Sequence, residues 1–153
     1  VAQLAGMEEG GIKFKKEGDD TAKKDSYAAL KKFGDHDRES ISSTTPGSIY
    51  KVQLDNSHPL AFGYPGYYYT LKMDDNVYEF INNGWNVGVI KKDNLVAGFV
   101  GSELKKKLND GVIYGVQDIG RGNIIYLADD VLFRNFWQNG KLMFCNALFM
   151  VGQ

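Results

Sequence analysis

The last third of the chain most constrains the fold, because two strand-like runs flank a glycine-containing turn. Residues 112–117 and 123–128 are rich in Val, Ile and Tyr, and Asp118-Ile-Gly-Arg-Gly122 joins them. Glycines in such a connection supply the positive φ that a hairpin turn needs. The pattern predicts a hairpin, followed by a packed aromatic segment at 133–137 and a terminal helix at 141–151.

The terminal run 141–151 is apolar on almost every side, which predicts a buried helix. It contains Cys145, the single cysteine of the sequence, so the chain forms no internal disulfide. A small thiol in an apolar run is typical of packing. A nucleophilic cysteine would need a neighbouring base, and the histidines of the sequence are His36 and His58. We therefore expect Cys145 to be buried and inert.

Further strands and one helix are expected between residues 48 and 109. Residues 48–54 alternate as a half-buried strand does, and helix character at 101–109 comes with Ser102 as N-cap and Leu104 and Leu108 on one face. The other expected strands are 67–73, a short one at 77–81, and 85–90 paired with 95–100 through the connection 91–94. Strands with interspersed helices predict an α/β or α+β fold, with a mixed sheet and flanking helices.

The N-terminal part, residues 1–47, is polar and is expected to be partly irregular, before a β-rich core at 48–151 of one domain spanning 1–153. Apolar spacing predicts a short helix over Thr21–Phe33, and Ser and Thr residues predict a loop over Asp35–Pro46. Val1–Gly6 reads like the end of a helix stopped by glycine. We therefore expect the chain to be a piece of a longer protein.

Charge and hydropathy argue against two classes of partner. The net charge is −1, so no global field attracts nucleic acid or an anionic membrane. No run approaches the roughly 20 apolar residues of a membrane helix. We expect neither nucleic-acid binding nor membrane insertion.

The sharpest local motif is His36-Asp-Arg-Glu39. A histidine and a glutamate three residues apart can both ligate zinc when a third ligand arrives from elsewhere. Here that ligand would be His58 or a carboxylate. The competing interpretation is a solvated, charged loop, because so short a pattern often arises by chance.

Two further polar groups allow a binding and a structural interpretation. Asp118 and Arg121 lie in a turn that resembles a phosphate-cradling loop, but the spacing and the following strand favour a hairpin. Arg134, near Asp129-Asp130, either orients a ligand or forms an ion pair close to a helix start.

Exposed aromatic residues are the other candidates for ligand contact. Alternation places Tyr67 and Tyr69 on one face of a strand, where they line either a core or a binding surface. The full set of candidate aromatics is Tyr64, Tyr67–Tyr69, Trp85 and Trp137.

A set of ordered motifs resembles the C-terminal region of large bacterial zinc carboxypeptidase-like proteins, over most of residues 40–151. The motifs are Pro46–Gly63, Gly84–Gly88, Ala97–Gly101, Gly115–Gly122 and Leu132–Trp137. The resemblance implies a truncated flavodoxin-like, class I glutamine-amidotransferase-like domain. It also implies an upstream peptidase domain as partner, with zinc in that domain and no cofactor here, in a secreted or periplasmic protein.

On this resemblance, the expected function is that of a non-catalytic accessory domain of a zinc carboxypeptidase. Two alternatives stay open. One is a carbohydrate- or peptide-binding module that uses exposed tyrosines and tryptophans. The other is a zinc hydrolase fragment that uses His36 and Glu39.

Overall fold

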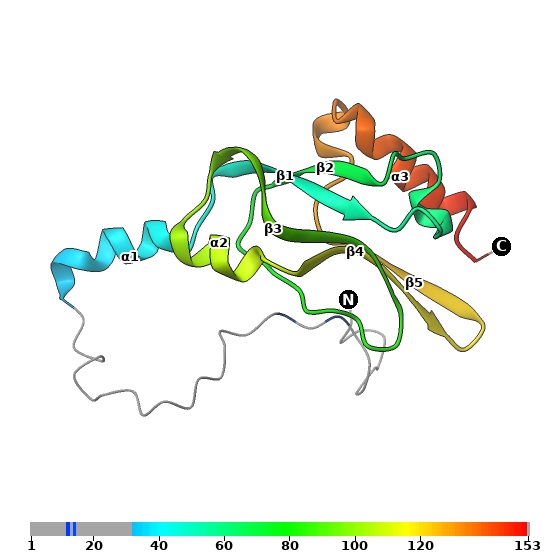
Figure 1. Ribbon diagram of the computed structural model, residues 1–153, viewed down its shortest axis with the longest axis horizontal. Coiled ribbons are helices and arrows are strands. Elements are labelled where there is room, and N and C mark those ends of the chain that lie inside the picture. The colour runs from blue at the N-terminus through cyan, green and yellow to red at the C-terminus, as the bar shows by residue number, and fades with distance from the viewer. Residues whose placement is uncertain (1–11, 13, 15–31, 153) are drawn as a thin grey trace.

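A curled antiparallel sheet of five strands carries helices at both ends (Figure 1). The computed structural model describes residues 12, 14 and 32–152. The strands are β1 (Gly47–Leu54), β2 (Tyr67–Lys72), β3 (Trp85–Phe99), β4 (Gly111–Ile119) and β5 (Gly122–Leu127), in the spatial order β2-β1-β3-β4-β5. The helices are α1 (His36–Ser42), α2 (Ser102–Leu108) and α3 (Gln138–Phe149), with 3-10 turns η2 (Phe33–Asp35), η3 (Pro59–Ala61) and η4 (Phe133–Asn135).

The fold is α+β, the second of the two classes expected. Every strand pairing is antiparallel, in place of the mixture of parallel and antiparallel pairs that a mixed sheet has. Among the described residues, no helix combines the length and the apolar character needed to cross a membrane.

The alternation predicted for β1 and β2 is confirmed. Tyr50, Val52 and Leu54 of β1 point into the core, while Lys51 and Gln53 point out. In β2 the even positions are buried, and Tyr67 and Tyr69 are exposed. Because side chains alternate across a strand, β2 presents one set of residues to the core and another to solvent.

Strand β3 differs from the expected pair of strands. It is one strand of 15 residues, and β1 pairs with both of its halves, from Leu54 opposite Gly88 to Gly47 opposite Phe99. The polar segment 91–94 forms a bulge within this pairing, with Asp93 at φ 64°. A bulge bends its strand and increases the twist, so the turn-like residues curl the sheet instead of starting a hairpin.

The hairpin β4–β5 confirms the prediction from the glycine turn, with Ile119 paired to Gly122 and Gly120 at φ 58°. Val77–Ile81, by contrast, does not form the short strand expected there. Tyr78 makes isolated bridges to Val112 and to Phe14.

Helix α2 buries Leu104 and Leu108, as predicted. Its N-cap is Gly101, not Ser102. Gly101 lies so close to the end of α1 that a Cβ there would collide with the carbonyl of Ser42. The contact therefore requires a glycine at position 101, and Ser102 is the first residue of the helix, with no side-chain cap.

Helix α1 lies where a loop was expected, and none of its residues is buried. Asp37 and Glu39 in its first turn favour a helix at this position, because carboxylates stabilise helix N-termini. The expected helix end at Val1–Gly6, and most of the helix expected over Thr21–Phe33, lie outside the described residues. Phe33 belongs to η2 and is exposed.

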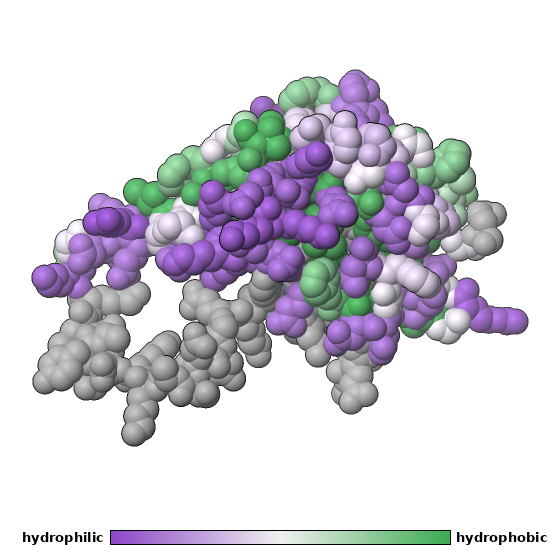
Figure 2. Space-filling model, in the orientation of Figure 1, coloured by the Kyte–Doolittle hydropathy of each residue, from purple (hydrophilic) through white to green (hydrophobic). Residues whose placement is uncertain are grey.

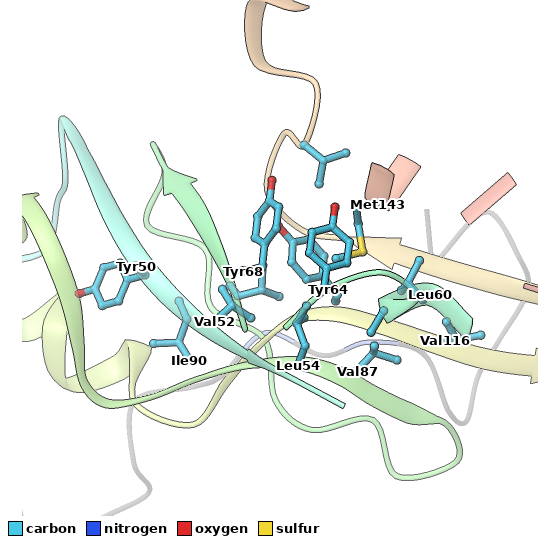
Figure 3. Packing of buried hydrophobic residues seen from close by; sticks show 14 of the residues in the cluster. Tyr50, Val52, Leu54, Leu60, Tyr64, Tyr68, Val87, Ile90, Val116 and Met143 are labelled. Carbon is cyan, nitrogen blue, oxygen red and sulfur yellow. The ribbon is translucent and has the colours of Figure 1, made fainter. Parts of the chain in front are cut away.

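Helix α3 covers one face of the sheet, and Met143 lies next to Tyr64 in the core (Figure 3). The Asn146 amide donates to the carbonyls of Leu60 (3.0 Å) and Phe62 (2.8 Å), which fixes the helix on η3. The expectation of burial on all sides is wrong: Leu148 is 57% exposed, and Cys145 is exposed as well. One side of α3 packs, so apolar composition alone overstated its burial.

The first prediction concerns the contribution of α2 to stability. Leu108→Ala should lower the free energy of unfolding by about 2–5 kcal/mol, because it opens a cavity among fully buried side chains. The control Leu148→Ala, on the exposed side of α3, should change it by less than about 1 kcal/mol. Urea unfolding measures both. Equal losses in the two variants would contradict this packing.

Candidate functional site

An open groove lies on the outer face of the sheet, between strands β1–β3 and the segment that leads into α3. Its volume is about 750 Å³. In Figure 2, hydrophobic residues gather along the upper edge of the molecule, above the curl of β1 and β3. The lining residues come from three strands, from the connections before β2 and before α3, and from the first turn of α3: Ile49, Pro65, Tyr67, Tyr69, Val96, Phe136, Trp137, Gln138 and Asn139.

The floor of the groove is built from the outward residues of β2. Tyr67 and Tyr69 are each 37% exposed. Their ring centroids are 5.5 Å apart and the rings meet edge to face, at 68°. Lys51 of β1 places its Nζ 4.5 Å from the centre of the Tyr67 ring, a cation–π distance. The floor is therefore aromatic, with a cation on one side.

The opposite wall is the segment Phe136–Asn139, which one hydrogen bond fixes to β2 and another fixes to the connection before β2. The Trp137 indole N–H donates to the carbonyl of Tyr69 (3.3 Å), and the Tyr64 hydroxyl donates to the carbonyl of Asn139. Phe136 is 60% exposed and meets Trp137 edge to face, with centroids 6.3 Å apart. The wall thus presents an exposed ring on an anchored backbone.

A buried polar cluster on the other face of β2 connects the floor to the segment that becomes the wall. Lys72 is fully buried, and its Nζ lies 3.2 Å from Asp129 Oδ1. The Thr70 hydroxyl donates to Asp129 Oδ2 (2.5 Å), and Lys72 also pairs with the partly exposed Asp74. Asp129 follows β5 and precedes the wall by a few residues, so this cluster fixes where the wall begins.

The pKa directions in this cluster follow from one cation shared by two carboxylates. Burial alone would lower the pKa of Lys72, but Asp129 and Asp74 outweigh burial and the pKa is raised. Burial raises the pKa of Asp129, and Lys72 and Thr70 offset only part of that rise. Lys72 therefore stays protonated, and it pairs with two carboxylates, that of the buried Asp129 and that of the partly exposed Asp74.

Three tyrosines, Tyr64, Tyr68 and Tyr114, contact one another in the core. Tyr68 meets Tyr64 and Tyr114 edge to face, with centroids 5.7 Å and 5.4 Å away. Burial raises the pKa of Tyr68 to about 12 and raises the pKa of Tyr114 well above its ordinary value. These hydroxyls stay protonated at neutral pH, which suits them to packing and hydrogen bonding and not to proton transfer.

The groove's lining suits it to binding by contact and stacking. Seven of its nine lining residues are apolar or aromatic, and the other two, Gln138 and Asn139, are amides. None of these nine residues, which belong to the described part of the chain, is a carboxylate, a histidine or a cysteine. Such a surface offers van der Waals contact, ring faces and a few hydrogen bonds, which is the composition of a small-ligand or peptide site.

The structure brings together three of the aromatic residues singled out from the sequence, namely Tyr67, Tyr69 and Trp137. Trp85 lies elsewhere, 56% exposed, with its ring 6.2 Å from that of His58. Tyr64 is buried and is not a contact residue, because its hydroxyl is committed to the wall backbone.

The polar candidates lie apart from the groove lining. Asp118 and Arg121 are exposed at the tip of the β4–β5 hairpin, where Asp118 accepts a hydrogen bond from Asn123. This favours the turn interpretation of the segment. Arg134 stacks on Phe133 at 5.2 Å, and Phe133 in turn contacts Phe136. Arg134 therefore lies next to the wall. It forms no pair with Asp129, whose carboxylate bonds Lys72 and Thr70.

His36 and Glu39 lie on α1, at the opposite end of the molecule from the turn that holds His58 (Figure 1). The His36 side chain is largely exposed, with Nδ1 3.4 Å from Asp37. His58 Nδ1 accepts from the Leu60 amide, and burial lowers its pKa. Within residues 32–152 and the two described positions before them, no three potential ligands converge on a metal site.

Sequence reasoning missed the aliphatic and amide part of the groove. Ile49 pairs with Ala97, and Val96 is the extra residue of a second register shift in β3, while Gln138 and Asn139 belong to a wall that packs from far along the chain. Only the alternation of Ile49 with the buried residues of β1 carried a signal that it faces outward. Val96 could not be placed, because its position depends on the register shifts between β1 and β3.

Comparison with protein-family models, with curated proteins and with solved structures finds no match for this chain. The likeness to zinc carboxypeptidase-like proteins stays a prediction from the sequence motifs.

The second prediction concerns the buried cluster. Lys72→Met leaves Asp129 buried without its counter-charge and should lower the free energy of unfolding by about 3–5 kcal/mol. Lys106→Met, which breaks the exposed pair with Glu103 (2.9 Å), should cost less than about 1 kcal/mol. Chemical denaturation compares the two.

The double variant Lys72→Met/Asp129→Leu separates charge from packing. It should recover part of the loss, because an apolar pair of similar volume replaces a buried ion pair at little cost. A Lys72→Met variant as stable as the wild-type protein would contradict the role of the cluster.

Proposed function

We propose that this domain is a non-catalytic accessory module that binds an extended peptide in the aromatic groove. The observation that carries the proposal is the convergence of Tyr67, Tyr69, Phe136 and Trp137 on one open groove. Exposed aromatic rings gathered in a concave surface are typical of binding sites. The groove's volume of about 750 Å³ suits a few residues of a peptide.

Ring geometry favours a peptide over a carbohydrate. Tyr67 and Tyr69 meet at 68° and Phe136 and Trp137 at 84°, so neighbouring rings form notches and not a flat platform. A sugar also brings many hydroxyl groups, each of which costs free energy if it is buried without a partner. Among the lining side chains, the amides of Gln138 and Asn139 and the two tyrosine hydroxyls are the groups that could satisfy them.

The wider setting of the module belongs to the same proposal. The motifs that resemble those of zinc carboxypeptidase-like proteins support a secreted or periplasmic parent, with zinc and an upstream peptidase domain, and a glutamine-amidotransferase-like origin for this region. In that setting the groove would present a peptide to the neighbouring domain. The all-antiparallel sheet does not support the flavodoxin-like part of the resemblance, because flavodoxin-like folds are built on parallel strands.

The third prediction tests peptide binding with a phage-displayed library of random dodecapeptides. Peptides selected on the wild-type domain should bind Tyr69→Ser and Phe136→Ser at least about fivefold more weakly, because each variant removes an aromatic contact. Trp85→Ser removes an aromatic residue outside the groove that is about as exposed as Phe136 (56% against 60%) and should leave affinity unchanged. Isothermal titration calorimetry measures each affinity.

Two results would overturn the proposal. One is the absence of any enriched peptide whose affinity depends on the groove. The other is groove-dependent binding of a soluble oligosaccharide such as cellohexaose, in which case the carbohydrate alternative holds.

The zinc alternative has a separate test. If His36 and Glu39 bind a metal, calorimetric titration with Zn²⁺ should give binding that His36→Ala abolishes. The present proposal expects no difference between the wild-type protein and that variant.

A further inference from the structure

The hydrogen bonds at the floor of the groove limit how a peptide can bind there. β2 is an edge strand, so its outward backbone groups would be available to an added strand. The Trp137 indole already occupies the carbonyl of Tyr69. A ligand that paired with β2 as an extra strand would have to displace this bond and the wall that it anchors.

The groove instead suits a peptide whose backbone needs few hydrogen bonds from the protein. Polyproline II is such a conformation, because its backbone has no internal hydrogen bonds and stays solvated. Its fixed φ angles also reduce the conformational entropy lost on binding. Grooves lined by aromatic rings recognise proline-rich segments in this way. The notches between the perpendicular rings of the floor and of the wall offer apolar contact to successive pyrrolidine rings.

The charges beside the groove restrict the ligand further. Lys51 stacks on Tyr67 at the floor, and Arg134 stacks on Phe133, the ring next to Phe136 at the wall. Both cations are exposed, and none of the nine lining residues carries a negative charge. Charge complementarity therefore calls for an acidic residue in the ligand, beside its apolar segment.

We infer that the ligand of the groove is a proline-rich peptide in the polyproline II conformation, flanked by acidic residues. The inference rests on the proposed function and specifies its ligand class.

Fluorescence of Trp137 in a Trp85→Phe variant provides a direct test, since the sequence contains two tryptophans and this variant leaves only the one in the groove. Three blocked decapeptides serve as probes. The first has two Glu followed by eight Pro, the second two Lys followed by eight Pro, and the third two Glu followed by alternating Leu and Gly. We expect the Glu-Pro peptide to bind about tenfold more tightly than either of the others, for reasons of charge and of preorganisation.

The charge contribution is checked by Lys51→Gln, which should reduce the advantage of Glu over Lys by about two- to fivefold, as for an exposed ion pair. Lys105→Gln, an exposed lysine on α2, is the matched control and should leave the ratio unchanged. Raising the salt concentration to about 0.5 M should reduce the same advantage in the wild-type protein, because exposed charges are screened.

The outcomes separate this inference from the function on which it rests. If the Leu-Gly peptide binds as tightly as the Glu-Pro peptide, the ligand class is wrong and peptide binding stands. If the Lys-Pro peptide binds as tightly as the Glu-Pro peptide, the acidic requirement is wrong. If none of the peptides binds, the inference is overturned, and the phage selection then decides whether peptide binding falls with it.

Discussion

The buried ion pair between Lys72 and Asp129 is the interaction on which the candidate site depends. It joins an edge strand to the segment that follows the last strand, 57 residues further along the chain. Because Lys72 and Thr70 face the core, Tyr67 and Tyr69 must face outward on the same strand. One strand therefore positions the wall with its inner face and forms the floor with its outer face.

In this arrangement the cluster of hydrogen-bonded polar groups lies in the core, and the groove on the surface is largely apolar. The polar groups of Lys72, Asp129, Thr70 and Tyr114 lie inside, where they form hydrogen bonds with one another. The groove has aromatic and aliphatic side chains instead. A surface of this kind distinguishes ligands by shape and apolar contact, with Lys51 and Arg134 adding a preference of charge at its border.

Much of the fold follows from local pattern, and the site follows from it only in part. Alternation in β1 and β2 and the glycine turn between β4 and β5 were sufficient to predict those strands, and alternation placed Tyr67 and Tyr69 on one face. The bulge in β3 was not predictable, because Lys91-Lys-Asp-Asn94 is equally typical of a turn. Nor was the wall, since the bond from Trp137 to Tyr69 spans 68 residues and leaves no periodic signal. The exposed side of α3 was missed because composition does not show which side of an apolar helix is covered.

The central claim is that floor and wall form one ligand-binding groove, and mapping of amide and indole NMR shifts tests it most directly. On titration of the ¹⁵N-labelled domain with the Glu-Pro decapeptide, the account predicts the largest shift changes at Tyr67, Tyr69, Val96 and the Trp137 indole. The Trp85 indole and the β4–β5 hairpin should stay unchanged. Saturable shifts confined to Trp85, to the hairpin or to α1, with the groove signals unmoved, would contradict the account.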